Sequence, residues 1–248
     1  MAGRRGLIMG VANDHSIAWG IARTLAAHGA EIAFSYQGEA LGKRVTPLAA
    51  SLGSDLVLPC DVEDLASVDR MFAAIRERWG RLDFLVHAIG FSDKRELKGR
   101  YADTTRENFS RTMVISCFSF TEIARRAADM MPHGGSMITL TFGGSSRVMP
   151  NYNVMGVAKA ALEASVRYLA SDFGPQGIRV NALAPGPVDT DMMRKNSQEA
   201  IDGMVGGTLM RRLAGADEMV GPALLLTSDA GSYMTGQVII VDGGGTPR

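Results

Sequence analysis

The stretch Gly6-Leu7-Ile8-Met9-Gly10-Val11-Ala12-Asn13-Asp14-His15-Ser16-Ile17-Ala18-Trp19-Gly20 decides the fold. It opens with a short apolar run that ends in glycine, as a buried parallel strand does. Apolar residues then recur with helical spacing up to Ala27, and Gly29 is placed to end that helix. The small residues between strand and helix, such as Gly10 and Ser16, let backbone N–H groups approach a pyrophosphate. The order predicts a nucleotide-binding α/β unit.

Six further apolar segments alternate with helical segments along the chain. They are residues 31–35, 55–58, 82–88, 136–141, 179–183 and 237–241. Helices are predicted over 64–79, from about 106 to 131, and over 151–173. This alternation predicts one α/β domain over residues 1–248, with a doubly wound, parallel, seven-stranded sheet of the Rossmann type. Ligands are then expected at the carboxyl ends of the strands.

The composition excludes several classes of function. Lys plus Arg and Asp plus Glu are equal at 26 each, so there is no electrostatic case for a nucleic-acid or membrane partner. The first apolar run is too short for a signal peptide or a membrane span, and we expect a cytoplasmic protein. The two cysteines, Cys60 and Cys117, have neither metal-ligand nor disulfide-framework spacing, so no metal site is expected.

Tyr152 and Lys159 stand seven residues apart at the start of the predicted helix 151–173. Seven residues is close to two helical turns, so the two side chains share a face, and the lysine stem leans back toward the tyrosine. Because a nearby cation favours the phenolate, we expect Lys159 to lower the pKa of Tyr152. Taken alone, the pair could also be a solvated lysine and a core tyrosine. Its position directly after the fifth strand favours a site.

Three residues at other strand ends suit an adenosine group. Gln37 follows the second strand, where a dinucleotide fold carries an acid for the ribose or an arginine for a 2′-phosphate. Its amide can bond ribose hydroxyls but offers no charge to a phosphate, which favours NADH over NADPH. Asp61 and Val62 follow the third strand and suit the adenine amine and ring. His87 has apolar neighbours and is predicted to be an interior histidine.

The helix 151–173 carries two further patterns. Glu163 and Arg167 are spaced for an i,i+4 ion pair. A stripe of small residues, which permits close helix approach, predicts pairing between identical subunits. Its members are Gly156, Ala160 and Ala164.

These features together resemble the enoyl-acyl-carrier-protein reductases, divergent members of the short-chain dehydrogenase/reductase superfamily. The resemblance runs from about Gly6 to Asn181. It is carried by Gly10…Ser16-Ile17, Tyr36-Gln37, Cys60-Asp61-Val62, Ile89-Gly90 and Pro150-Asn151-Tyr152-Asn153-Val154-Met155-Gly156…Lys159.

The resemblance implies NADH-dependent reduction of the C2=C3 double bond of an enoyl thioester in fatty acid biosynthesis. It implies a substrate on acyl carrier protein or coenzyme A, and a homotetramer. Tyr152 would bond the thioester oxygen as negative charge develops, and Lys159 would hold the nicotinamide ribose. Other implied cofactor contacts are Gly10, Ser16, Ile17, Gln37, Asp61, Val62, Ile89, Val188 and Thr190.

Two places depart from the family pattern. The family often has a second tyrosine ten residues before the first, and this chain has Phe142, which can shape the pocket but cannot donate a proton. The segment from Ala184 to Met192 resembles the Pro-Gly-x-Val-x-Thr segment of ordinary short-chain alcohol dehydrogenases, and a hybrid origin would account for it. A lid over the acyl chain is expected within residues 188–210.

Two other functions stay open. A ketone or alcohol oxidoreductase of this superfamily needs Tyr-x3-Lys and a serine thirteen residues before the tyrosine. Those positions hold Met155 and Phe142, and neither can donate a proton. The other alternative is a dinucleotide-binding protein that has lost catalysis, since fold does not determine function. The presence of both Tyr152 and Lys159 speaks against it.

Overall fold

A computed structural model describes residues 1–246, and within them seven parallel strands form one sheet in the order β3-β2-β1-β4-β5-β6-β7. The predicted doubly wound sheet is confirmed, with strand ends displaced by no more than two residues. The strands are β1 (Arg5–Met9), β2 (Glu31–Tyr36), β3 (Val57–Pro59), β4 (Phe84–His87), β5 (Gly135–Leu140), β6 (Ile178–Pro185) and β7 (Val238–Val241).

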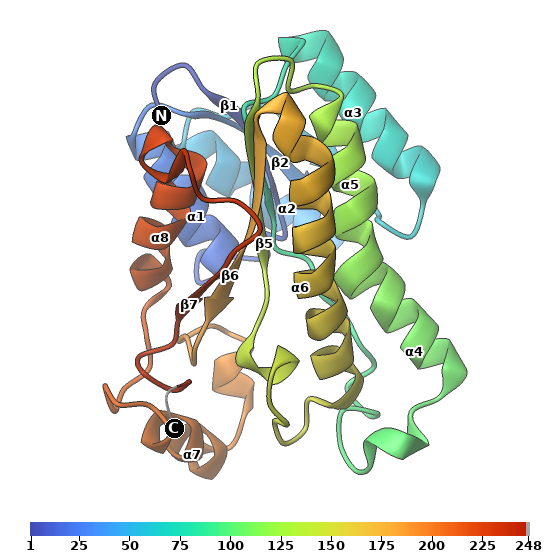
Figure 1. Cartoon of the computed structure of the whole chain (residues 1–248), viewed down its shortest axis with the longest axis vertical. Helices are drawn as coiled ribbons and strands as arrows, with labels where there is room; N and C mark the ends of the chain where they lie inside the picture. The colour runs from blue at the N-terminus through green and yellow to red at the C-terminus, as the bar shows by residue number, and fades with distance from the viewer. Residues whose placement is uncertain (247–248) are drawn as a thin grey trace.

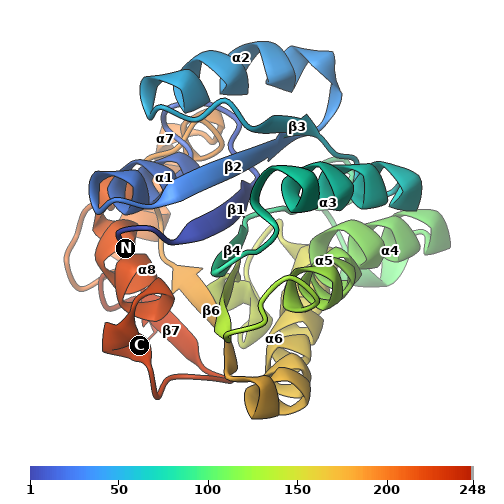
Figure 2. The same cartoon turned by 90° about the horizontal axis from the view of Figure 1, so that it is seen from above.

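Helices cover both faces of the sheet. Figure 2 shows α1, α2 and α8 on one side and α3, α5 and α6 on the other. Helix α7 lies beyond the carboxyl ends of the strands, at the foot of Figure 1. The helices are α1 (Ile17–Ala27), α2 (Gly38–Ser51), α3 (Leu65–Trp79), α4 (Arg106–Met113), α5 (Ser119–Ala128), α6 (Asn153–Phe173), α7 (Gln198–Gly206) and α8 (Val220–Thr227).

Strand β1 separates two hydrophobic layers because alternate side chains of a strand point to opposite faces. Leu7 and Met9 join the core under α3, α5 and α6, whereas Ile8 joins the core under α1 and α8. All three are fully buried. A strand buried on both faces therefore needs an uninterrupted apolar run, which is why the pattern at residues 6–10 could be read from the sequence.

Gly10 ends β1 in a conformation that only glycine adopts without strain. Its φ is 94°, and a Cβ atom there would overlap the carbonyl oxygen of Ala88, which follows the neighbouring strand β4. The chain can therefore turn over the sheet edge between β1 and β4. The strand order reverses between these two strands, and open α/β sheets bind ligands at that point.

The predicted helix from 106 to 131 is wrong in one respect, because it is interrupted. Residues Val114–Phe118 form a π-helical turn, η2, between α4 and α5. In this wider turn the hydroxyl of Ser116 both accepts from the N–H of Phe91 and donates to its carbonyl oxygen, each at 2.8 Å. The turn thus fastens the loop that follows β4. Such single turns occur often at functional sites.

Substituting Gly10 by alanine should destabilise the protein by about 2–4 kcal/mol, since it adds backbone strain and overlap with Ala88. Gly53→Ala is a matched control, because Gly53 also has a positive φ, 75°, but nothing within 4 Å of its Cβ position. The control should lose only about 1 kcal/mol. Urea unfolding without cofactor measures the stability of both variants. Equal losses of stability would refute the close approach at Gly10.

Candidate active site

Tyr152 enters the site from a strained turn between β5 and α6. Its neighbours Asn151 and Asn153 have positive φ values of 57° and 33°, a region that asparagine tolerates better than most residues. The amide of Asn153 donates to the carbonyl oxygens of Glu96 and Gly99 at 3.2 and 3.3 Å. The start of α6 is therefore held by the loop that follows β4.

The Tyr152 ring is fixed by packing. It meets the Phe142 ring edge-on, with centroids 5.1 Å apart, and it lies against Gly144, where a Cβ atom would overlap it. Burial raises the pKa of Tyr152 above the usual value of a phenol. The side chain thus keeps its proton at neutral pH, and the pocket-shaping role of Phe142 stays a prediction.

Lys159 is almost completely buried, with 6% of its surface exposed. Its Nζ donates to the carbonyl oxygen of Leu140, the last residue of β5, at 2.8 Å. Burial lowers the pKa of Lys159 to about 8. The expectation that Lys159 lowers the pKa of Tyr152 is therefore wrong, because the ammonium bonds a backbone carbonyl and burial of the phenol dominates.

The end of β4 approaches the same lysine. A Cβ atom on Gly90 would lie 3.8 Å from Lys159 Nζ and 3.7 Å from the terminal carbon of Met155. Ile89 packs against the core beneath this turn. The structure thus brings the predicted Ile89-Gly90 and Lys159 together at the carboxyl edge of the sheet.

The predicted adenosine residues also converge in part. The amide of Gln37, just after β2, donates to the Asp61 carboxylate at 2.9 Å. The N–H of Asp61 bonds the Ser67 hydroxyl at 3.0 Å, which holds the turn after β3. Val62 is buried and belongs to the hydrophobic core, so it contributes an apolar floor more than an exposed contact.

The loop that follows β1 is joined to the chain that follows β6. Ser16 donates to the carbonyl oxygen of Asn13 at 2.7 Å, immediately before α1 begins at Ile17. The Asn13 amide donates to Asp191 at 2.6 Å, and His15 Nδ1 lies 3.7 Å from the same carboxylate. Sequence reasoning missed this link, because nothing in the local pattern relates residues 178 positions apart.

Val188 and Thr190 lie at the base of the same segment. Val188 is buried and forms a bridge with Ala214, and its carbonyl oxygen accepts from the N–H of Thr190 at 2.9 Å. The Thr190 hydroxyl oxygen accepts from the N–H of Met193 at 3.3 Å, so it also begins the turn η5 (Met193–Lys195). Thr190 immediately precedes Asp191, which bonds Asn13 of the Gly10 loop, and the cofactor contacts of Val188 and Thr190 stay predictions.

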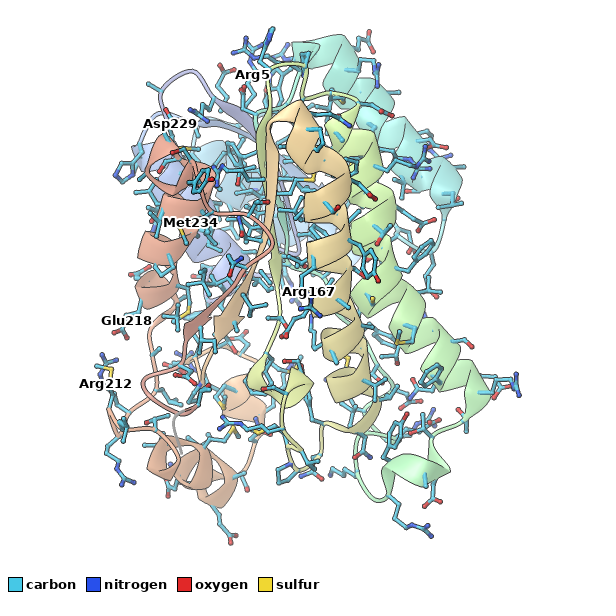
Figure 3. The ribbon with its side chains drawn as sticks, in the orientation of Figure 1. Arg5, Arg167, Arg212, Glu218, Asp229 and Met234 are labelled. Atoms are coloured by element: carbon cyan, nitrogen blue, oxygen red, sulfur yellow. The ribbon has the colours of Figure 1, made fainter. Side chains whose placement is uncertain are left out.

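Thr141 and Glu163 form a contact that sequence reasoning also missed. The Thr141 hydroxyl donates to Glu163 Oε1 at 2.6 Å. The predicted Glu163–Arg167 pair is wrong: no such ion pair occurs among those of residues 1–246, and Arg167 projects from the exposed side of α6 (Figure 3). The Glu163 side chain points inward and contacts Thr141, the residue that follows β5, instead of Arg167 one turn away.

The buried histidine and cysteines belong to the interior of the protein. His87 is fully buried, and its ring nitrogens bond Thr139 at 3.2 Å and Ser119 at 3.0 Å, which confirms an interior role. Burial, followed by the charge of Lys159, lowers its pKa to about 3. Cys60 and Cys117 are free and buried, as expected of reduced thiols.

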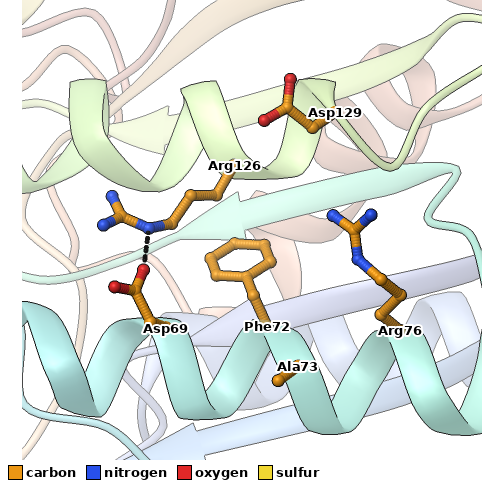
Figure 4. Close-up of a pocket in the computed structure, with 6 residues that line it drawn as sticks. All are labelled: Asp69, Phe72, Ala73, Arg76, Arg126 and Asp129. Carbon is orange, nitrogen blue, oxygen red and sulfur yellow. Dashed lines mark hydrogen bonds and ion pairs between the residues drawn. The ribbon is translucent and has the colours of Figure 1, made fainter.

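A shallow cavity of about 250 Å³ lies away from this edge, between α3 and α5 (Figure 4). None of the predicted site residues lines it. Its lining residues are Asp69, Phe72, Ala73, Arg76, Arg126 and Asp129.

Within residues 1–246 no cluster of three or more His, Cys, Asp or Glu side chains is placed to hold a metal ion. In the same residues, every helix is too short or too polar to cross a membrane.

The arrangement fits a dinucleotide. Gly10 opens the sheet edge between β1 and β4 to backbone contact, and α1 begins there without a side-chain cap on its N–H groups. At the other end, Lys159 has three ammonium donors and one bonded acceptor, Leu140.

The sequence matches the family model described as enoyl-(acyl carrier protein) reductase over residues 10–246. The chain belongs to this family. One reductase relative, enoyl-[acyl-carrier-protein] reductase [NADH] 2 of Rhizobium meliloti strain 1021, is 64% identical over 246 residues, covering 98% of this chain and 92% of that protein.

Solved structures of the reductase family agree in shape. FabI from Candidatus Liberibacter asiaticus has a TM-score of 0.96 at 53% identity, covering 100% of this chain and 96% of that chain. The enzyme from Anaplasma phagocytophilum, solved in complex with NAD, has a TM-score of 0.93 at 50% identity, covering 100% and 94%. The resemblance therefore extends past Asn181, where the motifs ended, and the segment after Ala184 needs no hybrid origin.

Replacing Lys159 by methionine should raise the free energy of unfolding at neutral pH by about 1–2 kcal/mol. A lowered folded-state pKa of about 8 means that the buried charge opposes folding below pH 8, an effect lost as pH rises toward the unfolded value of 10.5. The lost bond to Leu140 offsets part of the gain. Urea unfolding should show a gain that shrinks above pH 8.

Lys94→Met is the control, because Lys94 is exposed. Its stability should change by less than about 0.5 kcal/mol. A less stable Lys159→Met protein would show that Lys159 supports the fold instead of opposing it.

Proposed function

We propose that this chain uses NADH to reduce the C2=C3 double bond of enoyl thioesters carried by acyl carrier protein, in fatty acid biosynthesis. The observation that carries the proposal is the fixed Tyr152 phenol at the carboxyl edge of β5, on the helix that also places Lys159. Family membership supports the same chemistry.

Tyr152 acts as a neutral hydrogen-bond donor. Burial raises the pKa of its phenol, so the proton is present at neutral pH and can be donated to the thioester oxygen as negative charge develops there. Bound NADH supplies a hydride to C3. Phe142 cannot donate, so Tyr152 is the donor of this aromatic pair, and the edge-on contact between the two rings holds it in place.

Lys159 holds the nicotinamide ribose. With a pKa of about 8 it is mostly protonated at neutral pH, and the donors not bonded to Leu140 are left for ribose hydroxyls. Its buried positive charge also adds a favourable field for a developing anion. Above pH 8 both contributions decline.

The adenosine end favours NADH. Gln37 and Asp61 are joined by a hydrogen bond, and a 2′-phosphate beside the Asp61 carboxylate would meet a like charge. Ribose hydroxyls, by contrast, can donate to that carboxylate. Gly10, Ser16, Ile17, Val188 and Thr190 supply the pyrophosphate region.

Residues 188–210 form the lid over the acyl chain. Met192, Leu209 and Met210 expose apolar surface in or at the end of this segment. Its far end is fastened where the N–H of Met210 donates to the carbonyl oxygen of Gly243 at 3.0 Å. Its near end is fastened at Asp191 by Asn13. An apolar segment held at both ends can cover a hydrocarbon chain without leaving the site.

A cytoplasmic location stays a prediction.

Tyr152→Phe should lower kcat with an enoyl thioester about 100-fold, since one donor to the developing oxyanion is removed. NADH affinity should change little. Tyr233→Phe is the control, because Tyr233 is fully exposed. NADH absorbance follows turnover of enoyl groups on acyl carrier protein and on coenzyme A, and of a simple ketone.

The proposed reaction would be refuted if the wild type reduced the ketone alone. Tight NADH binding without turnover of any enoyl thioester would instead indicate a catalytically silent binding protein. Full activity in Tyr152→Phe would remove the role given to Tyr152.

The homotetramer is supported by exposed apolar side chains on adjoining elements, and by the small-residue stripe on α6. The exposed side chains on α4, η2 and α6 are Phe109, Val114, Phe118, Val157 and Tyr168. Of the stripe, Ala160 is exposed, whereas Gly156 faces Gly144 within the same chain, since a Cβ atom on Gly156 would overlap the Gly144 carbonyl oxygen. Apolar patches of this kind mark protein interfaces.

Light scattering should give a particle four times the chain mass of 26.5 kDa. Phe118→Asp should yield a smaller particle, because a buried charge at an interface is unpaired. Leu65→Asp on α3 is the control, as Leu65 is 48% exposed and Phe118 is 52% exposed. A wild-type monomer at micromolar concentration would contradict the assembly.

A further inference from the structure

Two residues of α6 are anchored to two successive residues at the end of β5. Lys159 Nζ donates to the carbonyl oxygen of Leu140 at 2.8 Å, and Glu163 accepts from the hydroxyl of Thr141 at 2.6 Å. Residues four apart on a helix lie on one face, so the ammonium and the carboxylate are neighbours. Lys159 and Thr141 are 6% and 4% exposed, which places both contacts away from bulk water.

We propose that Glu163, held by Thr141, is a positioning residue that keeps Lys159 protonated for cofactor binding. It acts through Lys159 and need not touch the cofactor. The inference deepens the proposed function, and it rests on the ribose-holding role given there to Lys159.

The charges around Lys159 leave Glu163 as its counter-charge. His87, from β4, is neutral at physiological pH because burial lowers its pKa to about 3. Cys117, from η2, is a neutral thiol because burial raises its pKa. Burial lowers the pKa of Lys159, and Cys117 and Glu163 oppose that shift. Because the Cys117 thiol is neutral at physiological pH, the negative charge comes from Glu163. Removing it leaves the ammonium with no ionised partner among these groups.

Thr141 holds the Glu163 carboxylate in place. Its hydroxyl donates to that carboxylate at 2.6 Å. It also directs the Glu163 oxygen to the strand, and within residues 1–246 no ion pair of 4.0 Å or less joins Glu163 to Lys159. A direct pair would occupy ammonium donors. With the carboxylate held by Thr141, the field of Glu163 acts on Lys159 while the remaining donors stay available to a ligand.

The test is the NADH dissociation constant as a function of pH, from cofactor fluorescence with the full-length protein. Wild-type affinity should fall above about pH 8, where Lys159 loses its proton. Lys159→Met should bind weakly and show no such fall. In Glu163→Gln the loss of NADH affinity should begin about one pH unit lower, since an opposite charge nearby changes a pKa by about one to three units.

Glu163→Gln should also recover wild-type affinity near about pH 6, where Lys159 is protonated with or without its partner. A merely structural defect would weaken binding at every pH. Glu77→Gln removes the same charge from an exposed position on α3 and should leave the curve unchanged.

If Glu163→Gln loses NADH affinity at the same alkaline pH as the wild type, and Lys159→Met shows no such loss, this inference alone is overturned. No alkaline fall in the wild type would overturn the role of Lys159 as well. If Glu163→Gln does not fold, Thr141→Val and Thr141→Ser replace it: the valine variant should shift the fall to lower pH and the serine variant should not. Equal curves for those two would also overturn the inference.

Discussion

A buried ammonium group must find hydrogen-bond acceptors and counter-charge inside the fold, and the arrangement of this site follows from how Lys159 meets that need. The carbonyl oxygen of Leu140 can accept from it because the pairing of β5 with β4 stops at Thr139. Helix α6 must then run alongside β5 and β6, which also fixes where Tyr152 enters. The ammonium, the phenol and the Gly90 turn are consequently brought to one edge.

That edge is also where the rest of the chain delivers its polar residues. The strand order places the loop after β1 beside the turn after β4, with the ends of β2 and β3 farther along the same rim. Gly10 makes the first approach possible, and Gln37 with Asp61 closes the far end. Segments that are remote in sequence thus meet along one edge of the sheet.

Sequence patterns predicted what depends on local periodicity. Strand β1 could be recognised because both its faces are buried, and Tyr152 and Lys159 because their spacing matches the helix. The polar contacts were harder to predict from the sequence. Glu163 has an arginine four residues later, yet its side chain contacts Thr141, because the packing of α6 directs it inward. The rise in the pKa of Tyr152 was missed for a similar reason, because burial of a phenol is a property of the assembled site. Asn13 and Asp191 show the limit most clearly, as their contact joins two loops that are 178 positions apart in the sequence.

The π-helical turn at Val114–Phe118 carries a consequence for how this chain tolerates changes in length. Such a turn holds one residue more than a regular helix, so deleting a single residue there would restore uniform geometry and improve the local backbone. The phase of α4 relative to α5 would change little, because the wide turn already absorbs the extra residue, but the residues within the turn would move. Ser116 would then leave Phe91, and the loop that steadies Asn153 would lose its anchor. An irregularity in one helix therefore fastens the loop that holds the start of α6.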